Sequence, residues 1–307
     1  MHRCVCICRL SVYARLWTNG LSKWAMNKES RTQNILMVPP TYFKIGYEIN
    51  PFMRAVDGEL KIVNERIARQ QWDALQQIYL DLGFNVLQVT ASETHPDMVF
   101  TANQLLPFKD PSNYNQLSFV LSHMATAERA GEVIFFKQWA NERGYKTYQL
   151  NIGPFEGMGD ALWSFENNKL FLGHGYRTHQ DVANQLKKII QKPVINLKLI
   201  SPYFYHLDTC LAILDQDTCA YVKEAFDKDS LKKLDQHFKL KIEIPIEEAR
   251  KSLACNLFCP DGKTVIIDQQ NVDTISRLGD YKFKIKKVDT SEFLKSGGSV
   301  FCLKLAF

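Results

Sequence analysis

Hydrophobic residues follow two different spacings along the chain from residue 34 onward. In five segments they recur three and four positions apart, which is the spacing of an amphipathic helix. These segments are Glu59–Leu82, Glu128–Arg143, Gln180–Gln191, Asp229–Leu240 and Gln269–Leu278. We therefore expect five helices, each with one face against a hydrophobic core.

Short apolar runs between these segments predict strands. They are Ile35–Val38, Val86–Val89, Leu117–Leu121, Thr147–Leu150, Lys169–Leu172, Val194–Leu199, Leu211–Leu214, Lys239–Ile244, Thr264–Ile267, Lys282–Lys286 and Val300–Leu305. Two or more strands for every helix are too many for a simple alternating parallel sheet. The pattern indicates one α/β domain over residues 34–307, built from similar units that each hold several short strands.

Residues 1–33 differ from the rest of the chain in charge. The part up to Lys28 has five basic and no acidic side chains, which accounts for the whole excess of 38 Lys and Arg over 33 Asp and Glu. It lacks the hydrophobic region and cleavage site of a secretory signal. We interpret residues 1–33 as a basic extension, which is either a mitochondrial-type transit peptide or a segment upstream of a true start at Met26.

The remaining chain has 33 basic and 33 acidic side chains and therefore no net field for nucleic acid or anionic lipid. We expect neither a nucleic-acid nor a membrane partner, because the apolar runs are also far shorter than the roughly 18 residues of a membrane span. The eight cysteines include no Cys-x-x-Cys pair, which argues against a zinc site and a disulfide framework. This cysteine usage favours the cytoplasm, or the mitochondrion if the extension is a transit peptide.

Two segments contain residue types that are common in covalent and acid–base catalysis. Cys302 follows the glycine pair Gly297 and Gly298 in the last predicted strand. It is either a nucleophile beside a turn that a substrate can approach or a small buried hydrophobe. His206 and Asp208 would share one face of a strand, either as an acid–base site or as a structural hydrogen-bonded pair.

Other polar residues also allow two interpretations. The glycine-rich segment Glu156–Asp160 lacks the features of a phosphate-binding loop, so its carboxylates suit a cationic ligand or belong to an ordinary turn. Asn50 and Asn103 each end a short apolar run and are either ligand-binding amides or partners of the backbone. Arg129 and Arg177 are either clamps for a substrate carboxylate or structural ion-pair residues.

Taken together and in this order, short motifs resemble the guanidino-group-modifying enzyme superfamily, which includes arginine deiminases, arginine dihydrolases, dimethylargininases and glycine amidinotransferases. The motifs are Met37–Phe43 with Tyr47–Pro51, Phe100–Asn103, Glu156–Asp160, Tyr176–Thr178, His206–Thr209 and Gly297–Cys302. The resemblance implies the pentein fold, a five-bladed α/β propeller with pseudo-fivefold symmetry. The five expected helices agree with that fold.

The resemblance also implies a mechanism without a metal or an organic cofactor. Cys302 would attack the central guanidinium carbon, and Glu156 would orient His206. His206 would protonate the departing amine and then activate a water. The implied substrate contacts are Asp160 and Asp208 at the guanidinium and Arg129 and Arg177 at the α-carboxylate.

Asn103 indicates a subgroup of the superfamily. Deiminases usually have an aspartate there, whereas an amide can hydrogen-bond a neutral ureido group through both its donor and its acceptor. This pattern, with Asn50 as a second amide, resembles arginine dihydrolases and succinylarginine dihydrolases. We therefore expect a small guanidino amino acid as substrate and hydrolysis of arginine to ornithine, ammonia and carbon dioxide through a covalent S-linked intermediate.

Other functions remain open at this stage. A dimethylargininase or an amidinotransferase would fit the same motifs. A non-catalytic binding propeller, like the translation initiation factor of this fold, would not need Cys302, His206 and Glu156 together. A homo-oligomer is compatible with the sequence, which does not determine the oligomeric state.

Overall fold

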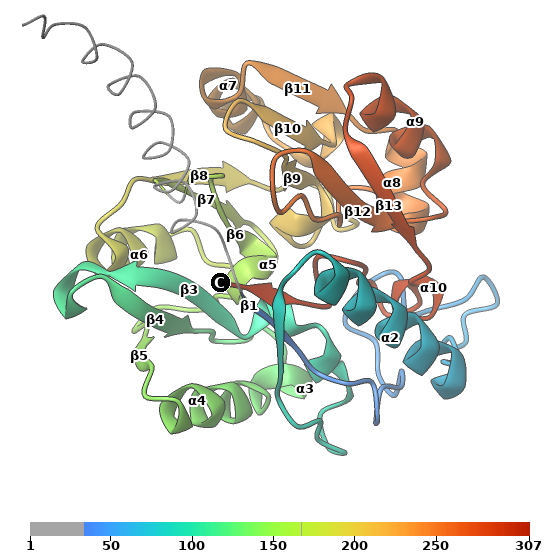
Figure 1. Cartoon of the computed structure of the whole chain (residues 1–307), viewed down its shortest axis with the longest axis horizontal. Coiled ribbons are helices and arrows are strands. Elements are labelled where there is room, and N and C mark those ends of the chain that lie inside the picture. Colours follow the sequence, from blue (N-terminus) through green and yellow to red (C-terminus); the bar gives the residue numbers. More distant parts are fainter. Residues whose placement is uncertain (1–33, 167) are drawn as a thin grey trace, which may run out of the picture. The chain divides into compact units, whose positions relative to one another are not determined.

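Five small sheets make up the framework of the computed structural model, which describes residues 34–166 and 168–307 (Figure 1). The strands are β1 Asn34–Met37, β2 Asn85–Gln88, β3 Leu105–Asp110, β4 Gln116–Leu121, β5 Lys146–Gln149, β6 Ala161–Trp163, β7 Leu170–His174, β8 Val194–Lys198, β9 Leu211–Ile213, β10 Thr218–Tyr221, β11 Leu240–Glu243, β12 Thr264–Asp268, β13 Lys284–Val288 and β14 Leu305–Ala306. The predicted extension 1–33 lies outside the described residues. The chain is thus an α/β protein with small sheets, as its hydrophobic pattern predicts.

The sheets repeat one topology. In three of them the central strand, β4, β7 or β10, pairs antiparallel with the strand before it and parallel with the strand after it. Strand β1 pairs in the same way with β2 and with the C-terminal β14, so the last strand of the chain completes the first sheet. In the fifth sheet β12 pairs parallel with β13, and the bridge from Phe258 to Ile266 stands where the antiparallel strand would be.

The helices lie in the connections between strands. They are α2 Glu65–Asp81, α3 Ala127–Ala130, α4 Val133–Glu142, α5 Gly157–Asp160, α6 Val182–Ile190, α7 Lys228–His237, α8 Ile246–Ser252, α9 Val272–Asp280 and α10 Ser291–Leu294. The longer helices connect the parallel strands of each sheet, and α5, α8 and α10 lie in the connections from one sheet to the next. Figure 1 shows the longer ones, α2, α4, α6, α7 and α9, on the outside of the sheets. Each therefore needs a single apolar face, in agreement with the predicted helical spacing.

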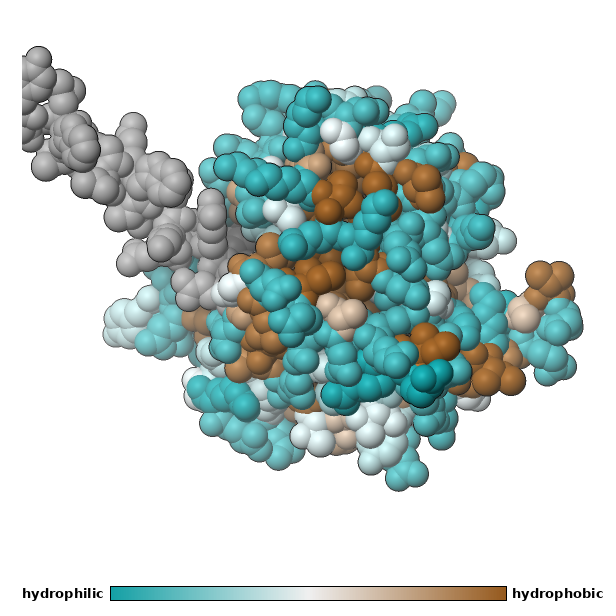
Figure 2. Space-filling model, turned by 45° about the vertical axis from the view of Figure 1, so that its right-hand side comes forward, coloured by the Kyte–Doolittle hydropathy of each residue, from teal (hydrophilic) through white to brown (hydrophobic). Residues whose placement is uncertain are grey.

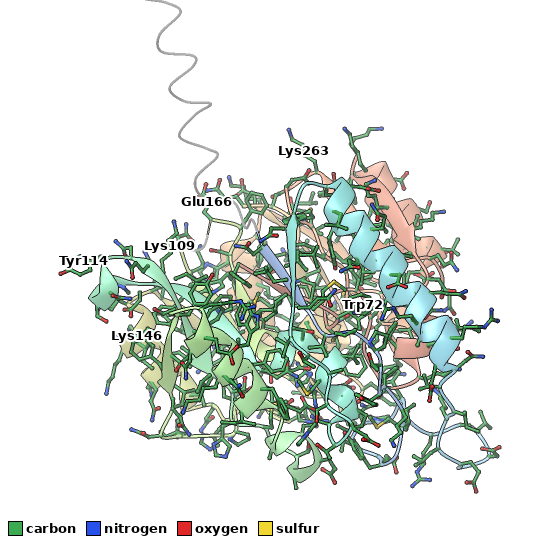
Figure 3. The ribbon with its side chains drawn as sticks, turned by 60° about the horizontal axis from the view of Figure 1, so that its bottom comes forward. Trp72, Lys109, Tyr114, Lys146, Glu166 and Lys263 are labelled. Atoms are coloured by element: carbon green, nitrogen blue, oxygen red, sulfur yellow. The ribbon has the colours of Figure 1, made fainter. Side chains whose placement is uncertain are left out.

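Helix α2 shows how the sequence specifies such an element. The Asn64 side chain accepts a hydrogen bond from the Ile67 N–H, which caps the helix start. Trp72, Leu75 and Tyr79 are completely buried at helical spacing. Figure 3 shows Trp72 on this helix, whereas Lys109, Tyr114 and Lys146 project from the sheet of β3, β4 and β5.

Several predicted boundaries differ from the structure. Helix α2 begins at Glu65 rather than Glu59, and the predicted helix Glu128–Arg143 is interrupted at Gly131 to give α3 and α4. The prediction lacks strands β3, β6 and β10: β3 contains a proline, β6 has only three residues, and β10 begins with a polar threonine. The short helices α5, α8 and α10 were not predicted either.

The last predicted strand is wrong over most of its length. Only Leu305 and Ala306 form β14, and residues 300–303 form a turn. The Asn256 side chain explains the turn, because its Oδ1 accepts hydrogen bonds from the backbone N–H groups of Ser299, Phe301 and Cys302, each at 3.1 Å. One acceptor that gathers three donors bends the backbone away from an extended conformation.

The surface of the described part carries both hydrophilic and hydrophobic residues. Figure 2 shows a face on which hydrophilic residues predominate and hydrophobic residues form small groups between them. Val56 and Ile62 are the most exposed aliphatic side chains of the segment between β1 and α2. No helix within residues 34–166 and 168–307 has both the length and the hydrophobicity that spanning a membrane requires.

Candidate active site

Six of the nine residues singled out in the sequence line one cavity. The cavity is small and is bordered by Cys302, His206, Asn50, Asn103, Arg129 and Arg177. These residues come from segments as distant as positions 50 and 302 and are all at least nine-tenths buried.

Cys302 lies at the cavity with its sulfur held between two polar groups. Its thiol donates to Asp208 Oδ2 at 3.1 Å, and Asn256 Nδ2 donates to Sγ at 3.1 Å. Burial and the Asp208 carboxylate raise the pKa of Cys302 well above its usual value. In this state the sulfur is a thiol that a nearby positive charge would activate.

His206 and Glu156 form a buried acid–base pair. His206 Nε2 and Glu156 Oε2 are 2.6 Å apart, and Arg177 Nη1 donates to the same carboxylate oxygen at 3.2 Å. Glu156 Oε1 accepts from the Ala125 N–H at 2.9 Å. Burial alone would raise the pKa of Glu156. The hydrogen bond from His206, the charge of His206 and the charge of Arg177 have a larger opposite effect and lower the pKa of Glu156 to about 2. Glu156 is therefore a fixed, ionised carboxylate that orients the His206 ring.

His206 and Asp208 do not lie on a strand, so that prediction is wrong. His206 is the residue before a short 3-10 helix, Leu207–Thr209, in which the Thr209 hydroxyl donates to the His206 carbonyl at 2.6 Å. This local turn directs His206 to Glu156 and Asp208 to Cys302. The two side chains therefore act on different partners.

Asn103 and Arg129 meet at the same cavity. Arg129 Nη1 donates to Asn103 Oδ1 at 3.0 Å, and Arg129 also binds both oxygens of Glu132 and the Asp97 carbonyl. Asn103 Nδ2 is buried and has no hydrogen-bond partner among the described residues. A buried donor without a partner costs free energy unless a ligand or water accepts from it.

Asn50 lines the cavity, but both of its side-chain hydrogen bonds are to backbone groups, as expected of a residue in a turn. Its Oδ1 accepts from the Phe52 N–H at 2.9 Å, and its Nδ2 donates to the Ser296 carbonyl at 3.0 Å. Both ends of the amide are thus used within the fold. Arg177 is also partly engaged, because its Nη2 donates to the Ile49 carbonyl at 2.6 Å.

Asp160 and Asp208 are buried but do not line the cavity. Asp160 accepts from the Thr178 hydroxyl at 2.7 Å and from the Leu207 N–H at 3.0 Å, so it supports the segment that carries His206. Asp208 Oδ1 has no hydrogen-bond partner among the described residues. Burial raises the pKa of each carboxyl group to about 7.

The glycines at this site have a different use from the one expected. They bring protein side chains close to the backbone rather than only a substrate. Gly297 has φ +83°, and a Cβ there would lie 2.8 Å from Asn50 Oδ1. A Cβ on Gly159 would collide with Asn103 Nδ2. Both positions therefore require glycine for the geometry of the cavity.

Sequence reasoning missed several residues of the site. Asp97 and Tyr205 line the cavity, and Asn256 binds Cys302. Asp97 begins the apolar run that ends at Asn103, so an acid within a buried segment was an available signal. Asn256 is separated from Cys302 by 46 positions and has no local signal in the sequence. In the described part of the chain, no group of three or more His, Cys, Asp or Glu side chains is arranged to hold a metal ion.

Comparisons with known proteins identify relatives of the chain. A family model described as "N,N dimethylarginine dimethylhydrolase, eukaryotic" matches residues 39–306. The N(G),N(G)-dimethylarginine dimethylaminohydrolase of Mycobacterium tuberculosis is 34% identical over 278 residues, which cover 90% of this chain and 86% of that protein. The bifunctional arginine dihydrolase/ornithine cyclodeaminase ArgZ of Synechocystis is 34% identical over 273 residues. The match covers 88% of this chain but only 37% of the length of ArgZ.

Solved structures of the N-terminal domain of ArgZ are similar to the described fold. The product-bound form, described as an arginine dihydrolase, has a TM-score of 0.81 and 33% identity and covers 89% of this chain and 96% of that domain. The same domain has been solved as a cysteine-to-serine variant bound to substrate and as an asparagine-to-serine variant covalently bound to a reaction intermediate.

Proposed function

The chain belongs to the N,N dimethylarginine dimethylhydrolase family, and from this premise we propose that it is a cysteine-dependent hydrolase of a guanidino group. Its substrate is arginine or a close analogue, and the bond cleaved is a carbon–nitrogen bond of the amidine. The contacts of Cys302, His206 and Glu156 support this chemistry, because a nucleophile and a carboxylate-held imidazole border the same small cavity.

In the proposed first step the Cys302 thiolate attacks the central guanidinium carbon. A new C–S bond forms, the C–N π electrons move to nitrogen, and His206 gives a proton to the amine that departs. Glu156 supports this step because its carboxylate stabilises the protonated imidazole. Asp208 lies at the sulfur, where it accepts from the Cys302 thiol, while Asp160 holds the backbone of the His206 segment in place.

In the second step His206, now neutral, takes a proton from a water that attacks the S-linked carbon. The C–S bond breaks and the thiolate returns, so one cycle on arginine releases ammonia and leaves a ureido group. A second cycle on that group releases another ammonia and the carbamate of ornithine, which decomposes to ornithine and carbon dioxide. Arginine and two waters then yield ornithine, two ammonia and carbon dioxide.

The observation that favours a dihydrolase is the free Nδ2 of Asn103 at the cavity. A ureido oxygen can accept from it, whereas the cationic guanidinium of the first cycle has only donors to offer. The amide therefore favours the neutral intermediate of the second cycle. Arg129 and Arg177 retain N–H groups for the α-carboxylate beside their bonds to Glu132 and Glu156.

Dimethylargininase activity is the second candidate, since the matching family model and the mycobacterial relative are named for that reaction. It would release dimethylamine and citrulline in a single cycle of the same mechanism. The two activities differ in whether citrulline is retained and cleaved again. Products formed from arginine and from dimethylarginine therefore distinguish the two candidates.

Other features of the proposal concern the whole chain. The repeated topology of five sheets, with β14 completing the first, supports a five-bladed pentein propeller over residues 34–307 with residues 1–33 as a separate extension. Five free cysteines in the described part support a reducing compartment such as the cytoplasm. We also propose that the chain forms a homo-oligomer, which analytical ultracentrifugation would test.

The experiment that tests the mechanism replaces the nucleophile. We expect Cys302→Ala to lower turnover of the preferred guanidino substrate by about 10⁴-fold or more, because no S-linked intermediate can form. Cys259→Ala is the matched control, since Cys259 is another free, buried cysteine that does not line the cavity. Retained turnover in the Cys302 variant would exclude covalent catalysis by this residue.

A further inference from the structure

Asn256 contacts the reacting sulfur, but the mechanism above gives it no part. The residue is 1% exposed and is not among those that line the cavity. Asn256 Nδ2 lies 3.1 Å from Cys302 Sγ and 3.2 Å from the Asp208 carbonyl oxygen. The amide therefore reaches the sulfur from within the protein rather than from the cavity.

The backbone near Cys302 determines which end of the Asn256 amide faces the sulfur. The other end accepts hydrogen bonds from the N–H groups of Ser299, Phe301 and Cys302, each at 3.1 Å. Three donors at one end require the oxygen there, because the amide nitrogen has no acceptor to offer. The nitrogen must then face Sγ and donate to it. A rotation of the amide by 180° would lose all three backbone bonds.

The two hydrogen bonds at Cys302 Sγ respond differently to ionisation. A thiol has one proton, and Cys302 donates it to Asp208 Oδ2 at 3.1 Å. The bond from Asn256 Nδ2 uses the sulfur as an acceptor and needs no proton on it. When the thiol loses its proton, the bond to Asp208 is lost, whereas the bond from Asn256 becomes stronger because its acceptor is now charged. Among the described side chains only Asn256 donates to this sulfur.

We propose that Asn256 is a catalytic residue whose amide stabilises the Cys302 thiolate by donating a hydrogen bond to it. The inference rests on the proposed function in that Cys302 is the nucleophile. The sulfur is negative twice in each cycle: before it attacks the substrate carbon, and again when the C–S bond breaks and its electron pair returns to sulfur. One fixed donor serves both steps. It adds to the effect of the cationic substrate, which reaches the sulfur from the cavity.

Asn256 also shapes the turn at residues 300–303, and a role confined to that turn predicts a different outcome. The turn depends on Oδ1, whereas the thiolate depends on Nδ2. Asn256→Asp keeps an oxygen for the three backbone donors and replaces the side-chain donor by an acceptor. The three N–H bonds favour the ionised form of the new carboxyl group. The variant should therefore keep the turn while the sulfur loses its donor.

A second variant removes the donor without adding a charge. Asn256→Leu is similar in size and has neither a donor nor an acceptor. We expect it to lower the melting temperature, because three buried N–H groups lose their partner. Asn256→Asp should melt close to the wild type. Asn256→Ala replaces Asn256→Leu if the larger side chain prevents folding.

The test measures alkylation of Cys302 by iodoacetamide in the full chain without substrate, between pH 7 and 10. The mass of the peptide that contains Cys302 gives the rate. Burial and Asp208 raise the pKa of Cys302, so the rate in this range follows a small fraction of thiolate. At pH 8 both Asn256 variants should be labelled about tenfold or more slowly than the wild type. Their rate profiles should lie about one unit or more toward higher pH.

Asn196→Asp is the matched control. Asn196 is a half-buried residue of β8 that does not line the cavity, and its Nδ2 donates to the Gln180 carbonyl at 3.4 Å. The change likewise removes an amide donor and adds a carboxylate. Labelling of Cys302 in this variant should keep the wild-type rate at every pH.

The outcomes separate this inference from the proposed function. Labelling of Asn256→Asp at the wild-type rate would overturn the inference, because the donor would then not be needed. Slow labelling of Asn256→Asp with wild-type labelling of the neutral variant would also overturn it, since the added charge would explain the change. Failure to turn over any guanidino substrate would overturn the proposed function but leave slow labelling of both variants as support for Asn256.

Discussion

Single residues at the cavity are held in fixed positions by their neighbours. Asn103 is held through its Oδ1 by Arg129, so its Nδ2 is fixed in position without a partner among the described residues. Glu156 is held by His206, Arg177 and a backbone N–H, so it stays ionised. A rigid carboxylate can orient a proton carrier, and a fixed free donor can select an acceptor in the substrate.

The first prediction concerns Asn103. We expect Asn103→Asp to shift the products of arginine from ornithine toward citrulline, because a carboxylate binds the guanidinium but cannot donate to a ureido oxygen. The ratio of citrulline to ornithine should rise about tenfold or more, in line with the loss of a hydrogen bond to a buried group. Quantitative amino-acid analysis measures it. Asn184→Asp, at an exposed position of α6, should leave the ratio unchanged.

The sequence predicted which residues belong to the site better than it predicted their contacts. Cys302, His206 and Asn103 border one cavity, as expected of residues in a common site. The partners of Asp160 and Asn50 were not predictable, because both bind backbone groups that only the folded chain brings near. Asn256 was missed for the same reason. A side chain that accepts from three backbone donors far along the chain leaves no pattern in the sequence.

Short elements position these residues, and they were the least predictable part of the fold. The five longer helical segments were expected from their spacing, since each buries a continuous apolar face. Helix α5 and the turn at residues 300–303 are too short to have a period. Their conformations depend on contacts between segments, such as those of Glu156 with Ala125 and of Asn256 with Cys302.

The second prediction concerns α5. Gly159→Ala would place a methyl group against the Asn103 amide and near the His206 ring. We expect kcat/KM for arginine to fall about a hundredfold while the fold is retained, because a small displacement of both groups disturbs the reacting geometry. Steady-state kinetics and circular dichroism measure the two effects.

A matched glycine change serves as the control for that variant. A Cβ on Gly279 in α9 meets no atom within 4 Å. Gly279→Ala should therefore keep full activity and raise stability by about 0.5–1 kcal/mol, as alanine does within a helix. Equal activity of the Gly159 and Gly279 variants would contradict the role assigned to α5.

For the whole molecule, the pairing of β14 with β1 brings the end of the chain into its first sheet. The backbone groups of Asn34 and Phe307 also bond in both directions, at 2.8 and 3.0 Å. This pairing fixes the turn that carries Cys302 relative to sheets formed much earlier in the chain. The fold thereby buries several charged groups at one site, and their titration affects the stability of the entire protein.

The third prediction follows from the burial of Asp160, which raises its pKa to about 7. The folded state binds this proton at pH values where the unfolded state has already lost it, so the group makes stability fall as pH rises from about 4 to 7. Between pH 5 and 8 the melting temperature of the Asp160→Asn variant should fall by at least about 3 °C less than that of the wild type. Differential scanning calorimetry measures it. The exposed Asp280→Asn should show the wild-type slope, and an Asp160 variant with that slope would contradict the prediction.

The most direct test of the account is to incubate the purified protein with arginine and to quantify ornithine, citrulline and ammonia together. We expect ornithine with two ammonia for each arginine consumed, and no accumulation of citrulline. Citrulline with one ammonia would contradict the role proposed for Asn103. Turnover of dimethylarginine without turnover of arginine would contradict the dihydrolase assignment.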